Sequence, residues 1–79
     1  MLQLLSGTTV LCDNIPSVDV EGAECTFIVP DTVTVSPELF GYALADDLGN
    51  IRTLNVMRVQ RHAPGQSLIT GILGPTRKR

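Results

Sequence analysis

The sequence has few of the residues that anchor a small core on their own. It contains no tryptophan, and its only aromatic residues in 79 positions are Phe27, Phe40 and Tyr42. Because each aromatic side chain buries a large area, their scarcity predicts a core built mainly from aliphatic residues. A chain of this length folds as one domain and buries only about 60% of the surface that it exposes when unfolded. We therefore expect self-association or docking on a larger partner to add to its stability.

Groups for catalysis and metal binding are also scarce. There is one histidine, His62, in a loop beside Arg61, and no serine occupies a Gly-x-Ser-x-Gly elbow. A zinc site needs three or four cysteine or histidine ligands, whereas the three such residues here are far apart in the sequence. The acidic segment 46–50 lacks the ligand spacing of a calcium loop, and Gly65 and Gly71 precede no Lys-Ser or Lys-Thr pair of a phosphate loop. The sequence therefore predicts no enzyme and no cofactor, metal or small-molecule partner.

Signals for export or membrane insertion are missing as well. Residues 1–12 have no basic segment ahead of their apolar residues, and no apolar run approaches the roughly 18 residues of a membrane-spanning helix. We expect cytosolic synthesis with no targeting signal and no membrane partner. Cys12 and Cys25 do not have the spacing of a zinc knuckle or a disulfide framework. Two buried free thiols are the simpler prediction, and one disulfide between neighbouring strands is the alternative.

What the sequence has in abundance is the alternation that is typical of β-strands. Residues 2–5 and 8–12, separated by a Ser-Gly turn, predict an N-terminal hairpin. Residues 18–21 alternate between valine and an acid, which predicts a short edge strand. Residues 24–35 alternate too, but Pro30 has no N–H group. We expect this segment to be either an edge strand or two strands joined by a bend.

Residues 36–49 fit a helix and a strand almost equally. A Ser-Pro pair at the start could begin a helix, but two aspartates would then lie at its C-terminal end, where the helix dipole disfavours negative charge. A strand would place Phe40, Tyr42 and Leu44 on one face and lead through an acidic turn into a return strand over residues 51–60. We prefer the hairpin.

A last strand over residues 67–73 follows the loop at residues 62–65, and Gly74-Pro75 ends it. The sequence therefore predicts an all-β fold, a small barrel or sandwich of about six short strands, with at most one short helix within residues 37–48. We place a single β-rich domain at residues 1–74 and a basic C-terminal tail at residues 75–79.

Charge is divided along the chain rather than mixed. All eight acids lie in residues 1–51 and all six bases lie in residues 52–79, although the formal net charge is only −2. The candidate partner-binding residues are these bases: Arg52, Arg58, Arg61, Arg77, Lys78 and Arg79. On a regular strand Arg52 and Arg58 would point to one face and Arg61 to the other, unless a bulge intervenes.

The divided charge has three interpretations. Acidic and basic strands could neutralise each other within one fold. Opposite faces could instead bring protein partners together, including copies of this chain meeting head to tail. The third is a nucleic-acid-binding β-barrel that uses Arg52, Arg58 and the basic tail, although the pI near 5.0 and the single aromatic pair available for base stacking do not favour it.

One segment resembles a known structural class. In residues 40–59, Gly41-Tyr42-Ala43-Leu44 leads through an acidic turn into a basic return strand, and this resembles β-hairpins of small phage head-decoration and tail-adaptor proteins. The resemblance covers about a quarter of the chain, carries over no functional residue and implies a structural role in a virion.

Our hypothesis is a non-enzymatic structural or assembly protein that acts through protein–protein contacts, as a homo-oligomer or as part of a larger assembly such as a phage virion. The alternatives are the nucleic-acid-binding barrel and a small inhibitor or adaptor that docks on a host enzyme.

Overall fold

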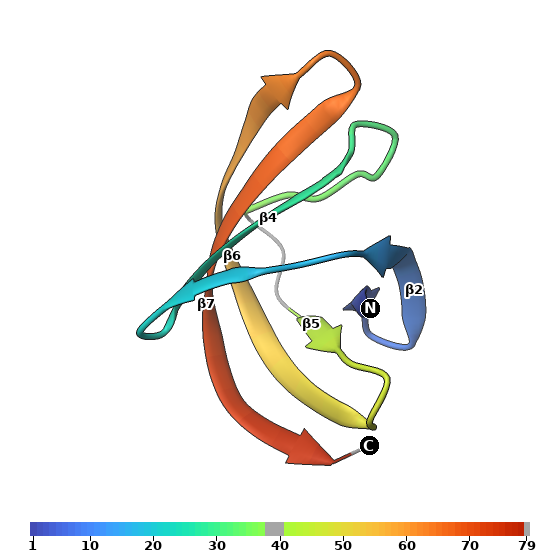
Figure 1. The fold of residues 1–79 in the computed structure, drawn as a ribbon, viewed down its shortest axis with the longest axis vertical. Helices are drawn as coiled ribbons and strands as arrows, with labels where there is room; N and C mark the ends of the chain where they lie inside the picture. The colour runs from blue at the N-terminus through green and yellow to red at the C-terminus, as the bar shows by residue number, and fades with distance from the viewer. Residues whose placement is uncertain (38–40, 79) are drawn as a thin grey trace.

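The structure, a computed structural model, describes residues 1–37 and 41–78 as one antiparallel β-sheet of seven strands (Figure 1). The strands are β1 (Leu2–Ser6), β2 (Thr9–Ile15), β3 (Asp19–Glu21), β4 (Glu24–Pro30), β5 (Tyr42–Ala45), β6 (Asn50–Ala63) and β7 (Gln66–Lys78). They lie in the order β2-β1-β5-β6-β7-β4-β3. The predicted all-β fold is confirmed. In this part of the chain no helix is long and apolar enough to cross a membrane.

The long hairpin of β6 and β7 runs along the whole molecule and joins two parts of the sheet (Figure 1). The first residues of β6 pair with β5, which continues the sheet through β1 to β2. At the other end of the hairpin the first residues of β7 pair with β4, which leads to β3. The hairpin is therefore the only element that hydrogen-bonds to both parts of the described sheet.

Three bulges interrupt the pairing of β6 with β7, and the one nearest the loop lies between Arg61 and Ala63. Between the pairs Arg52↔Thr76 and Leu54↔Leu73, strand β7 contains one residue more than β6. Gly74 and Pro75 occupy this position, and a bulge tolerates a proline because it removes the need for a ladder donor there. The prediction that the last strand ends at Gly74-Pro75 is wrong, because β7 bulges there and continues to Lys78.

The second bulge lies in β6. Val56 pairs with Gly71 and Arg58 pairs with Thr70, so Met57 between them has no partner. An extra residue reverses the alternation of side chains between the two faces of a strand. The alternation that begins before Met57 is therefore shifted by one residue after it. Each side chain after Met57 points to the opposite face from the one that an unbroken alternation would give it.

The core is aliphatic, as the composition predicts. Leu4, Ile15, Leu54 and Ile69 are completely or almost completely buried, and they come from four different strands. Strand β4 alternates as predicted: its buried side chains are Cys25, Phe27 and Val29, and Glu24, Ile28 and Pro30 are exposed. The buried Tyr42 keeps a polar contact, because its hydroxyl oxygen accepts a hydrogen bond from the backbone N–H of Ser36 at 3.1 Å.

The structure decides between several alternatives. The segment at residues 24–35 is neither an edge strand nor two strands, since β4 lies between β7 and β3 and ends at Pro30. There the backbone N–H of Asp31 donates to the carbonyl of Gly65 at 3.0 Å, and the chain leaves the sheet. The predicted hairpin of β5 and β6 is confirmed, although Phe40 lies outside the described residues. The predicted edge position of β3 is confirmed.

The two edges of the sheet, β2 and β3, are neighbours in sequence. Residues 16–18 join them, and Pro16 has no N–H group for a ladder. Strand β2 pairs only with β1, and β3 pairs only with β4, so the described strands do not form a closed barrel. Both edge strands leave backbone groups free for a further strand.

We predict that Gly71→Ala lowers the free energy of unfolding by about 1–3 kcal/mol, the usual cost of overpacking a core. A Cβ at this position would lie 2.7 Å from the backbone oxygen of Asn55 and 2.7 Å from Leu54 Cδ1. Chemical denaturation measures the change. Gly74→Ala is the matched control, because a Cβ at that position would clash with the side-chain hydroxyl of Thr53 and not with the backbone. Adding Thr53→Ala should therefore restore the stability that Gly74→Ala loses. A neutral Gly71→Ala variant would contradict the close approach of β6 to β7.

Candidate partner-binding surfaces

The arginines of β6 do not form one stripe. Arg52 pairs with the buried Leu44 of β5, and it precedes the buried Leu54 of its own strand by two residues. The side chain of Arg52 therefore points to the inner side of the sheet. After the bulge at Met57, Arg58 points outward. The arrangement expected for a regular strand, with Arg52 and Arg58 on one face, therefore does not occur, because a bulge intervenes between them. Arg61 lies at the exposed end of the hairpin, opposite Ser67.

The basic residues near the C-terminus belong to the sheet. Arg77 pairs with Ile51 and Lys78 pairs with Asn50, so both lie at the end of the molecule that carries the turn between β5 and β6. Their side chains are exposed. Arg79 lies outside the described residues.

The bases and acids are not paired with each other. Among residues 1–37 and 41–78 the only ion pair joins the N-terminal amine of Met1 to Asp47 at 2.6 Å, and both groups are exposed. No described arginine or lysine lies within 4.0 Å of a described carboxylate. Neutralisation by contact within the fold therefore does not account for the divided charge.

One face of the sheet carries separated charges, and we call it the outer face. It is formed by the outward side chains of β6, β7, β4 and β3. One row across it runs from Asp19 through Thr26 and Thr70 to Arg58. Because neighbouring strands are about 4.8 Å apart, the backbones of Asp19 and Arg58 are separated by about 14 Å across this row.

An acidic edge borders this face. It consists of Asp19, Glu21 and Glu24, and Glu21 lies directly opposite Glu24 in the pairing of β3 with β4. Like charges opposite each other on a sheet are unfavourable, and no described cation lies within 4.0 Å of either carboxylate. The acidic edge therefore carries repulsion that no described group offsets.

Exposed apolar side chains lie beside Arg58 and between it and the acidic edge. Met57 adjoins Arg58 and is 61% exposed, and Ile72 pairs with Glu24 and is 37% exposed. A shallow hollow of about 320 Å³ lies at this position, lined by Glu24, Met57, Arg58, Thr70 and Ile72. The outer face thus combines an acidic edge, a basic side chain and exposed apolar groups.

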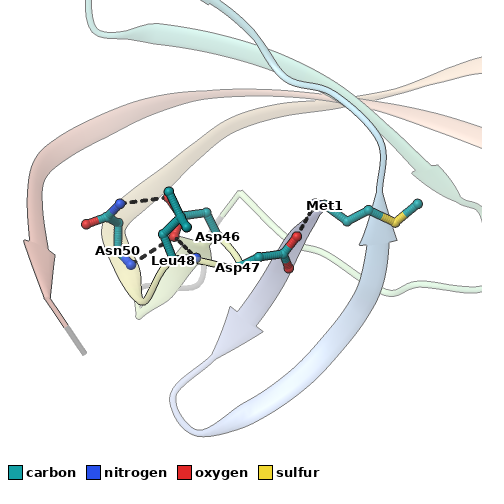
Figure 2. A network of polar contacts seen from close by, with 5 residues as sticks. All are labelled: Met1, Asp46, Asp47, Leu48 and Asn50. Carbon is teal, nitrogen blue, oxygen red and sulfur yellow. Dashed lines mark hydrogen bonds and ion pairs between the residues drawn. The ribbon is translucent and has the colours of Figure 1, made fainter.

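The acidic turn between β5 and β6 is held by its own hydrogen bonds (Figure 2). Asp46 Oδ1 accepts from the backbone N–H groups of Leu48 and Asn50, each at 2.9 Å, and Oδ2 accepts from Asn50 Nδ2 at 2.9 Å. The hydrogen bonds from Asn50 are the main cause that lowers the pKa of Asp46 below the ordinary value of an aspartate. These contacts hold the turn as the tip of the hairpin of β5 and β6, as predicted.

On the inner side of the sheet a cleft of about 260 Å³ opens at the end that carries this turn. Its apolar lining consists of Leu2, Val18, Val20, Leu44 and Leu73. Its polar lining consists of Asp46, Asn50, Arg52 and Thr76. Arg52 is half-buried there, and its Nε donates to the carbonyl oxygen of Gly74 at 2.8 Å.

Both cysteines are free thiols in the structure. Cys25 is buried and Cys12 is half-buried, and burial raises the pKa of the Cys25 thiol. In the part of the chain that the structure describes, no three histidine, cysteine or acidic side chains come together as a metal site.

No protein-family model, curated protein or solved structure matches this chain. What the outer face and the inner cleft can bind therefore follows only from the side chains that form them.

Sequence reasoning selected the bases but missed the cleft and the outer face. The lining of the cleft comes from β1, β3, β5, β6 and β7 and from the residues beside them, so no local pattern marks it. The outer face depends on a bulge at Met57, and the alternating sequence around that residue gives no signal for it.

We predict that Asp46 contributes stability that acid removes. A carboxyl group with a lowered pKa stabilises the fold above its unfolded pKa, and this contribution is lost as the pH falls below about 4 and through the lower folded pKa. The Asp46→Asn variant should therefore melt at a lower temperature than the wild type at neutral pH and lose less on acidification. Thermal unfolding followed across this pH range measures both effects.

Asp31→Asn is the matched control for this prediction. Asp31 is exposed, and its side chain accepts no hydrogen bond from the described residues, so this variant should follow the wild-type pH profile. Equal pH profiles for Asp46→Asn and the wild type would show that the turn does not depend on the charged form.

Proposed function

We propose that this chain is a non-enzymatic structural or assembly protein whose outer face binds protein partners, including further copies of itself. The observation that carries the proposal is that the acids and bases of this face form no ion pair with any residue that the structure describes. The acidic edge and Arg58 lie at opposite sides of one exposed surface with apolar side chains between them. Opposite charges on one surface allow head-to-tail contact between copies.

In this arrangement the acidic edge of one copy meets the basic side of the next, where Arg58 is exposed. Contact would relieve the repulsion between Glu21 and Glu24 and would cover the exposed Met57 and Ile72. A contact of this kind uses different patches on the two copies, so it forms a ring or a filament.

The concrete setting that we propose is a phage virion, with head decoration or tail adaptation as the role. The resemblance of residues 40–59 to hairpins of such proteins and the small size of the chain support this setting. A nucleic-acid-binding role is less well supported, because Arg52 and Arg58 lie on opposite faces of β6 and do not form one basic stripe.

We predict that the wild-type protein has a mass above 8.5 kDa at micromolar concentration and low salt, and that the mass falls at high salt. Asp19→Lys/Glu21→Lys and Arg58→Glu should each weaken association about tenfold or more, because like charges would then meet. An equimolar mixture of the two variants should associate again, since each carries the complement of the other. Analytical ultracentrifugation measures all of these states.

Asp13→Lys/Asp31→Lys is the control, because it makes the same change in charge on exposed acids away from the outer face. It should associate as the wild type does. A wild-type protein that remains monomeric at low salt would overturn self-assembly. A shift of DNA at low salt that is lost when residues 77–79 are deleted would instead favour the nucleic-acid-binding alternative.

A further inference from the structure

The cleft on the inner side of the sheet has no role in the contact proposed for the outer face. It lies at the open end of the inner surface, between β3 and the strands β5, β6 and β7. Its volume of about 260 Å³ is slightly below the range of about 300–1,000 Å³ that holds drug-sized ligands. The cleft is therefore suited to a group of few atoms.

The walls of the cleft are mainly apolar. Leu44 and Leu73 belong to the buried core, whereas Val20 is 52% exposed at the edge of β3. These residues form an apolar surface that continues from the core to solvent. An aliphatic chain placed there would cover Val20 and extend the core.

Arg52 supplies the polar feature of the cleft. Its guanidinium has five N–H donors, and one of them, at Nε, is held by the carbonyl oxygen of Gly74 at 2.8 Å. This bond fixes the plane of the group and leaves the donors on both terminal nitrogens, with no described carboxylate within 4.0 Å. Two parallel donors of this kind match the two oxygens of a carboxylate.

Asp46 also lines the cleft, but its carboxylate is already occupied. Three hydrogen bonds from Leu48 and Asn50 hold both of its oxygens within the turn. Arg52 is thus the charged group of the lining whose hydrogen-bonding capacity is mostly unused.

We propose that this cleft binds an aliphatic carboxylate, with the carboxylate on the terminal nitrogens of Arg52 and the apolar chain against Val20, Leu44 and Leu73. The ligand can be a free short-chain acid or the end of a protein chain with an aliphatic last residue, since both present the same chemistry. The inference does not rest on the function proposed for the outer face.

The test is a titration of the full chain with hexanoate, followed by the backbone amide shifts of Val20, Arg52 and Leu73 in NMR spectra. We expect saturable shifts at these residues, and binding that is about tenfold or more weaker for hexanamide, which lacks the charge. Arg52→Lys and Arg52→Gln should weaken hexanoate binding by a similar factor, because neither offers two parallel charged donors. Arg58→Gln removes the same charge from the outer face and should leave binding unchanged.

The ligand comparison protects the test against a folding defect in the Arg52 variants, because hexanoate and hexanamide are compared on the wild-type chain. An acetylated tripeptide that ends in leucine, with a free or an amidated C-terminus, separates the two sources. Tighter binding of the free-acid peptide than of hexanoate assigns the site to a chain end, and the reverse assigns it to a free acid. Absence of saturable shifts, equal binding of hexanoate and hexanamide, or an equal loss in Arg58→Gln would overturn the proposal.

Discussion

The bent hairpin of β6 and β7 is the constraint on which the rest of the structure depends. It is the only described element that pairs with both parts of the sheet, and its side chains Leu54, Ile69 and Leu73 lie in the core between them. Its bulges at Met57 and at Gly74-Pro75 change the direction of the two strands. A flat sheet of this size would leave one apolar face in water, so curvature is what allows an aliphatic chain without tryptophan to enclose a core.

The same bulges determine where the charges point. Arg52 precedes the bulge at Met57 and lines the inner cleft, whereas Arg58 follows it and lies on the outer face. The exposed acids of β3 and β4 therefore share a surface with Arg58 and not with Arg52. The division of charge along the chain becomes a division across the outer face, with Glu21 and Glu24 side by side at one edge. Within the described residues no ion pair compensates this repulsion.

The sequence predicted the strands well where the alternation was regular, as in the buried Cys25, Phe27 and Val29 of β4, and where turn residues separated apolar runs. It failed at prolines. Pro30 predicts an edge strand or a bend, but it is the last residue of an inner strand, where no further backbone N–H is needed. Pro75 predicts a strand end, but it lies in a bulge, which also leaves no need for a backbone N–H. The bulge at Met57 could not be predicted, because the pairing with β7 decides which residue of β6 is the extra one. The cleft could not be predicted either, since its residues come together from five strands.

The inner cleft and the outer face share strand β6, which contributes Arg52 to the cleft and Arg58 to the outer face. Arg52 and Arg58 lie on opposite faces of one strand, on either side of its bulge, so a ligand in the cleft and a partner on the outer face do not compete for the same atoms. A coupling between them would require the hairpin to change its bend. Gly71, which packs against the backbone of Asn55 next to this bulge, leaves little room for such a change. Close packing at the bend would therefore make the proposed occupation of one surface independent of the other.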